Sequence, residues 1–260
     1  MKLCCTSYSM REPIKAGKMD FFSYIDYAKK LKWDAVELHY NHFPDMGKDY
    51  LRKLKFHAVK SGIELGVVSG ANNFTLPDPG SREESVKGLV KAVKIAEYLG
   101  CPQIRAFGGP VPEGVSKEKA FEWCVESFKK VLPVAEESGV MVGLENHGGV
   151  TLTSDDVIAI LDAVDSDWIG LNMDTNNFPA EDRYSHMENV IDRIVQIHAK
   201  FFDVDENSGD TRIDYDRVLP MARDAGFNGF VSIEYEGKED PYLAVPKASK
   251  FLRSRLREPL

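Results

Sequence analysis

The chain has 260 residues, of which 43% are hydrophobic and 28% are charged, a composition that is ordinary for a soluble globular protein. Its formal net charge is −8, and no dense cluster of Lys and Arg occurs along it. Proteins that bind nucleic acid normally present a basic face. We therefore expect no nucleic-acid partner.

The cysteines and the N-terminal segment indicate the cellular location that we expect for the protein. Cys4, Cys5, Cys101 and Cys124 do not form a metal-binding spacing, and we interpret them as reduced thiols in the core. The N-terminus is not typical of a secretion signal, because Arg11 ends a brief apolar run that contains Ser and Thr. No apolar stretch approaches the ~20 residues that a membrane span requires. These features predict a soluble, cytoplasmic protein that has no membrane partner.

Strand-like and helix-like segments alternate along the chain. Short apolar runs bounded by turn residues predict eight strands, at residues 3–8, 34–39, 63–69, 103–107, 140–145, 169–174, 194–198 and 230–234. Capping residues and apolar faces of helical period predict eight helices, which begin near residues 20, 49, 81, 116, 154, 184, either 214 or 216, and 241. The segment Ser81-Arg82-Glu83-Glu84 has the pattern of a capping box for the third of these helices.

This alternation predicts an α/β fold in which right-handed crossovers join parallel strands. Eight such units in about 250 residues favour a closed barrel over an open sheet. The sequence contains no linker, no internal boundary and no low-complexity tract. We therefore expect residues 1–260 to form one (β/α)8 barrel domain.

Four successive predicted strands, the fifth to the eighth, carry a polar residue where an apolar run ends. These residues are Glu145, Asp174, His198 and Glu234. In a barrel of this kind, the carboxyl ends of the strands and the loops after them build the active site. Three converging carboxylates would repel one another without a cation, so we predict a site for one divalent metal ion, Mn, Mg, Co or Zn. The alternative is that each residue caps a neighbouring helix or pairs with a surface cation.

Other polar residues near the predicted barrel mouth allow two interpretations each. Arg105 either binds a substrate oxygen or forms a structural ion pair, and Glu37 either lines the pocket or belongs to the barrel rim. His147 either reaches the pocket or fixes its own loop. Lys200 shares the inward direction of His198, and we favour a role in binding substrate or balancing charge.

The motifs around these strand ends resemble those of the sugar phosphate isomerase/epimerase family. They are Leu-Glu-Asn-His around Glu145, Met-Asp-Thr around Asp174, Ile-His-Ala-Lys around His198 and Ser-Ile-Glu-Tyr-Glu-Gly around Glu234. Members are xylose isomerase-like barrels and include ketose 3-epimerases, hydroxypyruvate isomerases and inosose dehydratases. The resemblance covers essentially the whole chain but does not specify a substrate. It implies that the four residues bind one divalent metal and that the two glutamates move protons.

The sequence departs from this family's pattern after the sixth predicted strand. Many of the epimerases have Asp-Thr-x-His there, and this chain has Asp174-Thr175-Asn176-Asn177. Asn177 can still donate a hydrogen bond to substrate, but it carries no charge. The related endonuclease IV type needs additional histidines, and Ser69, Arg105 and Asn177 stand near those positions, so we exclude that activity.

Together these features predict a metal-dependent isomerase or epimerase that acts on a small sugar or keto-polyol. The metal would bind the carbonyl and adjacent hydroxyl oxygens and stabilise an enediolate. Glu145 and Glu234 would remove and return a proton from opposite sides. The residues expected to bind substrate are Arg105, His147, Asn177, Lys200 and Glu37.

Two other functions stay open at this point. A lyase or dehydratase would expel a β-leaving group from the same enolate, and only its leaving-group contacts would differ. A sugar-binding barrel could have kept the fold and lost the chemistry, although all four carboxylate and imidazole positions are intact. The sequence does not specify the sugar, its phosphorylation, the metal or the oligomeric state, and it leaves a homo-oligomer open.

Overall fold

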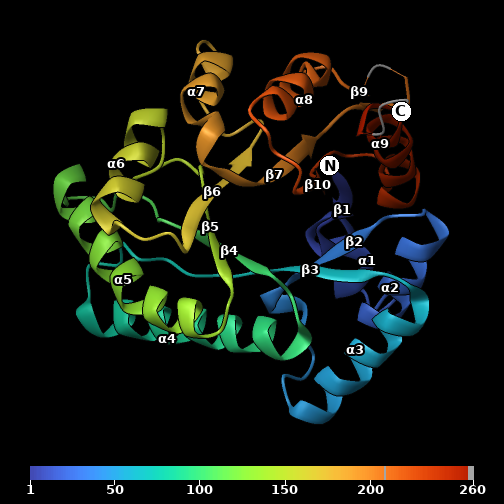
Figure 1. Cartoon of the computed structure of the whole chain (residues 1–260), viewed down its shortest axis with the longest axis horizontal. Coiled ribbons are helices and arrows are strands. Elements are labelled where there is room, and N and C mark those ends of the chain that lie inside the picture. The colour runs from blue at the N-terminus through green and yellow to red at the C-terminus, as the bar shows by residue number, and fades with distance from the viewer. Residues whose placement is uncertain (208, 257–260) are drawn as a thin grey trace. The chain divides into compact units, whose positions relative to one another are not determined.

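The computed structural model describes residues 1–207 and 209–256 of the chain (Figure 1). Eight strands form one sheet in the order β1-β10-β7-β6-β5-β4-β3-β2, and every pairing given below for this sheet is parallel. The chain divides into two compact units, which we call unit 1 and unit 2. Unit 1 comprises Met1–Gly66 and the segment from Gln196 onward, and unit 2 comprises Val67–Val195.

The strands of unit 1 are β1 (Lys2–Cys5), β2 (Ala35–His39), β7 (Ile194–Phe201) from Gln196 onward, and β10 (Phe230–Tyr235). Strand β10 pairs with β1 on one side and with β7 on the other. The register with β7 places Ser232 opposite His198 and Glu234 opposite Lys200. Because side chains alternate along a strand, these polar residues share one face of the two strands.

In the sequence, the helices of unit 1 lie between and after these strands. They are η1 (Ser7–Met10), α1 (Arg11–Lys15), α2 (Phe21–Lys30), η2 (Tyr40–His42), α3 (Lys48–Ser61), α8 (Tyr215–Asp224) and α9 (Pro241–Leu256). Asp20 caps α2 in a reciprocal arrangement with Ser23, and Asp214 caps α8. A short antiparallel pair, β8 (Val204–Asp205) with β9 (Gly209–Asp210), follows β7.

Unit 2 contains β3 (Glu64–Ser69) from Val67 onward, β4 (Gln103–Phe107), β5 (Met141–Glu145) and β6 (Ile169–Asp174). Helices α4 (Pro79–Leu99), α5 (Lys117–Glu137), α6 (Ser154–Val164) and α7 (Arg183–Val190) form one layer beside these strands, and the short η3 (Ile191–Arg193) follows α7 (Figure 1). Buried apolar side chains such as Val93, Phe128 and Ile160 fill the space between the layers. The register places Glu145 opposite Asn172.

A glycine pair after β5 turns the chain back toward the loop after β4. Gly149 has φ +55°, in the left-handed region that favours glycine. A Cβ at this position would collide with the carbonyl oxygen of Gly109. The next residue, Val150, donates a backbone hydrogen bond of 3.1 Å to that same oxygen. The glycine therefore lets the two loops that follow β4 and β5 lie in direct contact.

All eight predicted strands and all eight predicted helices occur, but several boundaries were wrong. The first strand ends at Cys5 rather than Tyr8, because the Thr6 side chain accepts a hydrogen bond from the Tyr8 backbone and starts a 3-10 turn. Asp78, and not Ser81, caps α4, and it accepts from the Ser81 backbone. Pro79 at the first helical position suits this earlier start, because its fixed φ is helical and it has no N–H to satisfy.

Two further boundaries and several short elements were not predicted. Helix α3 begins at Lys48, one residue before the expected start, with Gly47 as its N-cap residue, and β7 continues to Phe201, beyond His198. The short elements α1, β8 and β9 lie in segments that the sequence pattern did not assign. Segments this short have no period long enough to recognise.

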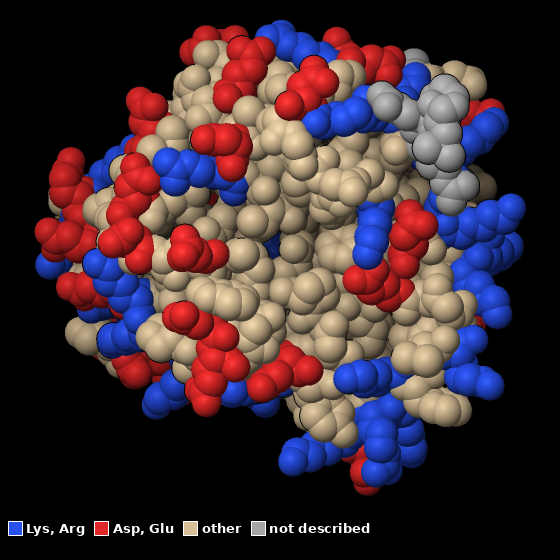
Figure 2. All heavy atoms as spheres, viewed as in Figure 1, with Lys and Arg blue, Asp and Glu red and all other residues tan. Residues whose placement is uncertain are grey.

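Acidic and basic side chains are interspersed on the face shown in Figure 2. Lys and Arg gather over α3, whose cationic residues are Lys48, Arg52, Lys53, Lys55 and Lys60. Within the described residues, no helix is both long enough and apolar enough to cross a bilayer.

Candidate metal centre

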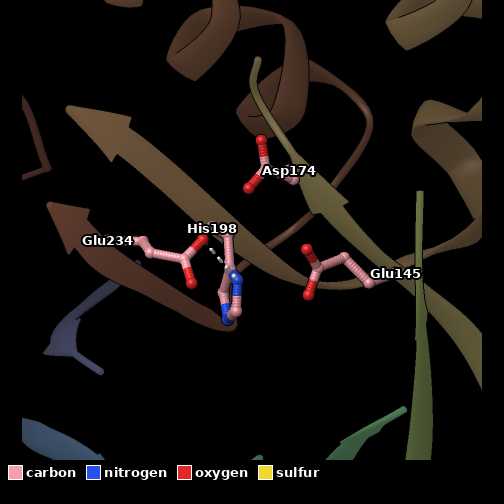
Figure 3. A group of neighbouring side chains, drawn as sticks. All are labelled: Glu145, Asp174, His198 and Glu234. Carbon is pink, nitrogen blue, oxygen red and sulfur yellow. Dashed lines mark ion pairs between the residues drawn. The ribbon is translucent and has the colours of Figure 1, made fainter. Parts of the chain in front are cut away.

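Four buried side chains from β5, β6, β7 and β10 each offer one atom that could bind a cation. Glu145, Asp174, His198 and Glu234 present ligand atoms that all lie within 4.8 Å of one another (Figure 3). These are the four residues that the sequence predicted as metal ligands. Three carboxylates and one imidazole form a donor set that suits a divalent cation. This buried four-residue site could therefore hold a metal ion.

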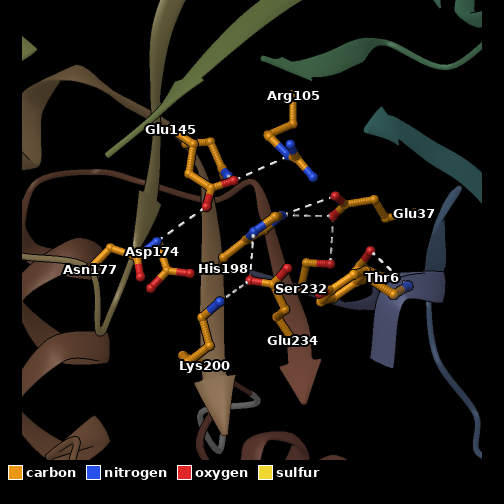
Figure 4. Close-up of polar contacts among 12 residues, drawn as sticks. Thr6, Glu37, Arg105, Glu145, Asp174, Asn177, His198, Lys200, Ser232 and Glu234 are labelled. Carbon is orange, nitrogen blue, oxygen red and sulfur yellow. Dashed lines mark hydrogen bonds and ion pairs between the residues drawn. The ribbon is translucent and has the colours of Figure 1, made fainter. Parts of the chain in front are cut away.

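In unit 2, the carboxylate of Glu145 forms an ion pair with Arg105 and accepts hydrogen bonds from two amides, one of them that of Asn177 (Figure 4). The Nε of Arg105 lies 3.1 Å from Glu145 Oε2. Asn172 Nδ2 donates to the same oxygen at 3.4 Å, and Asn177 Nδ2 donates to Oε1 at 3.3 Å. Because the carboxylate is buried, these contacts replace the water that it would otherwise bind.

Arg105 itself is fixed from three directions. Besides its ion pair with Glu145, it donates to the carbonyl oxygen of Gly70 at 3.1 Å. Its guanidinium carbon lies 3.9 Å from the centre of the Phe107 ring, and the residue is only 2% exposed. Of the two interpretations of Arg105, the structural ion pair is therefore the one that the structure contains.

Asp174 is positioned through its backbone by Asn146. The Asp174 N–H donates to Asn146 Oδ1 at 2.7 Å, and Asn146 Nδ2 donates to the Asp174 carbonyl oxygen at 3.0 Å. This reciprocal pair ties the end of β6 to the residue after β5. The Asp174 side chain also accepts from the Asn176 backbone at 2.8 Å. Sequence reasoning gave Asn146 no role, although it stands directly beside Glu145 in the recognised motif.

In unit 1, the imidazole of His198 lies between two carboxylates. Its Nε2 is 3.0 Å and 3.1 Å from the two oxygens of Glu37, and its Nδ1 is 3.3 Å from Glu234 Oε2. Glu37 also accepts from Ser232 (Figure 4) and from Gln196, both at 2.7 Å. The sequence predicted Glu37 as a substrate-binding residue, and the structure places it against a predicted metal ligand.

Lys200 links Glu234 to a more exposed carboxylate. Its Nζ lies 2.5 Å from Glu234 Oε2 and 3.1 Å from Glu236 Oε1. Lys200 therefore contacts two carboxylates, and its role in binding substrate or balancing charge stays a prediction. Glu236, Gln196 and Ser232 all lie two residues from a predicted ligand, so strand alternation is the sequence signal that finds them.

Burial and charge act in opposite directions on this cluster. Burial alone would lower the pKa of His198, but Glu37 and Glu234 outweigh it and raise the pKa well above its ordinary value. Burial alone would raise the pKa of Glu234, but Lys200 and His198 outweigh it and hold the pKa well below its ordinary value. For both groups, the charged neighbours therefore outweigh the effect of burial on the pKa.

His147 lies outside the four-residue group. Its side chain is exposed, and its ring centre is 4.5 Å from that of Phe107. Its backbone N–H donates to Thr151 Oγ1 at 2.9 Å, which closes the glycine loop after β5. These contacts fit the loop-fixing interpretation, and a contact with substrate stays a prediction.

The chain belongs to the xylose isomerase-like TIM barrel family, whose model matches residues 25–255. The fold is a TIM barrel of eight parallel strands with helices, as the sequence predicted. That residues 1–260 form one domain stays a prediction.

The curated relatives include isomerases and a decarboxylase. The chain is 26% identical over 267 residues to inosose isomerase of Halalkalibacterium halodurans, covering 96% of this chain and 93% of that protein. It is 28% identical over 154 residues to 3-oxo-isoapionate decarboxylase of Pectobacterium atrosepticum. That match covers 58% of this chain and spans only 50% of the decarboxylase.

A solved structure of the IOLI protein with a bound zinc atom has the same fold. It superposes with a TM-score of 0.77 at 19% identity, over 98% of this chain and 96% of that one. Solved structures that share the fold also include D-psicose 3-epimerases. At this level of identity the likeness shows the fold alone.

Proposed function

We propose that the protein is a divalent-metal-dependent isomerase or epimerase that moves a proton next to the carbonyl of a small sugar or ketose. The observation that carries this proposal is the buried group of Glu145, Asp174, His198 and Glu234, whose ligand atoms lie within 4.8 Å of one another. Membership of the xylose isomerase-like family and the full-length similarity to an inosose isomerase support it.

In this proposal the four residues hold the ion, which would supply Lewis-acid charge to the carbonyl and adjacent hydroxyl oxygens of the substrate. The donor set fits such an ion, because it combines three carboxylates with an imidazole in a buried site. The identity of the metal, manganese included, stays a prediction, as do a homo-oligomeric state and a cytoplasmic location.

Glu145 and Glu234 act as the acid/base pair in the proposed reaction. One carboxylate takes the proton from the carbon beside the carbonyl, and the other returns a proton to the enediolate. Positioned groups of this kind contribute about 10²–10⁴-fold each. Each carboxylate already has a buried cation beside it, Arg105 for Glu145 and Lys200 for Glu234, which favours the ionised form that a base requires.

The polar residues around the pair hold it in place and orient the substrate hydroxyls. Asn177 donates to Glu145, and Lys200 donates to Glu234. Both side chains are therefore next to the proposed proton transfer. Arg105 holds Glu145 in place through their ion pair. His147, in the loop after β5, contacts a substrate hydroxyl in this proposal.

A metal-dependent lyase is the second candidate, favoured by the similarity to a decarboxylase. Loss of carbon dioxide from the carbon next to a carbonyl leaves the same kind of enolate that proton removal generates, and such an enolate can instead expel a β-leaving group. The same four ligands and the same glutamates would serve this reaction. The difference lies in which group leaves the substrate.

Elemental analysis combined with proton exchange tests the proposal. Purified protein should contain a divalent metal, and incubation with a panel of ketoses, keto-inositols and 3-oxo sugar acids in D₂O should exchange one C–H of a substrate for deuterium. A chelator should abolish this exchange, and adding the metal back should restore it. An eliminated or decarboxylated product would replace the isomerase proposal by the lyase. Protein that purifies without metal and exchanges no proton would support a sugar-binding barrel instead.

A further inference from the structure

We infer that Glu37 is a positioning residue of the metal site, which accepts the Nε2–H of His198 and so directs Nδ1 toward the ion. This inference rests on the proposed function, since it assigns a role within the same site. It replaces the substrate-binding role that the sequence predicted for Glu37.

The geometry around His198 assigns different partners to the two ring nitrogens. Nε2 lies 3.0 Å and 3.1 Å from the two Glu37 oxygens. Nδ1 lies 3.3 Å from Glu234, which is one of the other three proposed ligands. A histidine that binds a metal usually donates its second ring N–H to a carboxylate, which fixes the tautomer and the ring orientation. Glu37 occupies that position.

Two further donors fix the Glu37 carboxylate itself. Gln196 Nε2 and Ser232 Oγ both donate to Glu37 Oε2 at 2.7 Å. Gln196 lies two residues before His198 on β7, and Ser232 lies two residues before Glu234 on β10. Because side chains two apart share one strand face, the strands that carry two ligands also carry the two groups that orient Glu37.

The burial of Glu37 argues for this role over substrate binding. The residue is 0% exposed, and its oxygens accept hydrogen bonds from three neighbouring side chains. A buried carboxylate is costly unless it is fully hydrogen-bonded. The His198 imidazole and the side chains of Gln196 and Ser232 supply the hydrogen bonds that stabilise the buried Glu37 carboxylate.

The test compares metal binding by the wild type, Glu37→Gln and a control, Glu64→Gln. Glu64 is also a strand glutamate with a cationic partner, Lys2, but it lies on the surface. Apo-protein would be titrated with Mn²⁺ and Zn²⁺ by calorimetry. We expect Glu37→Gln to weaken both affinities by about 10–100-fold, the range found for partners of metal-bound histidines. The control should bind like the wild type.

A second readout reports the tautomer directly. In ¹⁵N-histidine-labelled protein loaded with Zn²⁺, wild-type His198 should carry its proton on Nε2 and bind through Nδ1. Glu37→Gln should lose this single state, because the amide can offer either its oxygen or its NH₂ to the ring. Thermal unfolding of each apo-protein would establish that the variants are folded. If Glu37→Gln does not fold, Ser232→Ala should show a smaller loss of affinity and a shifted His198 signal.

The outcomes separate this inference from the proposed function. Equal metal affinity and an unchanged tautomer in a folded Glu37→Gln would overturn the positioning role and leave the metal site intact. A raised KM with unchanged metal affinity would return Glu37 to substrate binding. A wild-type protein that binds neither ion would overturn both the inference and the proposed function.

Discussion

The two proposed acid/base glutamates are held by different means in the two units. In unit 2, Glu145 pairs with Arg105 and accepts from the amides of Asn172 and Asn177. In unit 1, Glu234 pairs with Lys200 and His198. An arginine keeps its charge in proteins, whereas lysine and histidine can give up a proton.

The comparison shows that the two glutamates have different electrostatic environments. The partners of Glu145 hold it with a fixed charge and neutral amides. The partners of Glu234 can exchange protons, and Lys200 also contacts Glu236, whose side chain is 34% exposed. The unit 1 part of the site therefore contains a chain of titratable groups that leads toward solvent.

The largest expected effect comes from removing either carboxylate. Glu145→Gln and Glu234→Gln should each reduce substrate proton exchange by about 10²–10⁴-fold, because each is proposed to move one proton. Initial rates of deuterium incorporation measure this once a substrate is found. Near-normal turnover in either variant would defeat the acid/base assignment for that residue and leave only one active glutamate.

Arg105→Met should destabilise the protein strongly, because it leaves the buried Glu145 carboxylate without its cation. Breaking a buried ion pair in this way costs about 3–5 kcal/mol. Urea unfolding measures the loss, and adding Glu145→Gln to the same chain should recover part of it. A change close to that of an exposed surface variant would show that the pair with Glu145 contributes little.

Lys200→Met should cost less, about 1–3 kcal/mol, because Glu234 keeps His198 as a partner. Urea unfolding in parallel with Arg105→Met gives the comparison. Lys130→Met, which removes one side of an exposed pair with Glu83, provides the control. Equal losses for the Lys200 and Arg105 variants would break the distinction between the two glutamates.

The smallest effect concerns the pH dependence of stability and comes from His42, in the 3-10 helix η2 directly after β2. Burial, then Lys15 and Arg11, lower the pKa of His42 from its ordinary 6.5 to about 4. Because the unfolded chain binds this proton first, the contribution of His42 is present above pH 6.5 and is lost as the pH falls toward 4.

His42→Asn should therefore flatten the loss of stability between these two pH values, by at most about 1 kcal/mol because the side chain is partly screened by solvent. Unfolding midpoints measured across this range test it. An unchanged slope would show that acid sensitivity in unit 1 comes from other groups.

Several features of the site follow from local sequence signals. The apolar runs that end in Glu145, Asp174 and Glu234 predicted both the strands and the position of each carboxylate. Because side chains alternate along a strand, the positions of Gln196 on β7 and Ser232 on β10 alone put them on the same faces as the ligands. The helix start at Asp20 was predicted because a cap depends on residues only a few positions away.

The partners of the site residues could not be predicted in the same way. Arg105 allowed two interpretations, and only the tertiary structure shows that it pairs with Glu145, which lies two residues beyond its register partner Gly143 on β5. Glu37 contacts His198, which is 161 positions away in the chain. The choice of Asp78 over Ser81 as the α4 cap also depended on the actual backbone path.

The sequence by itself determined the alternation of strands and helices, the family and the identity of the four candidate ligands, because these depend on short-range periodicity and on residue type. The tertiary structure decided which donor holds which carboxylate and which nitrogen of His198 faces Glu37. Those contacts join strands that are distant in sequence, and a shift of one residue in strand register would turn every side chain to the other face.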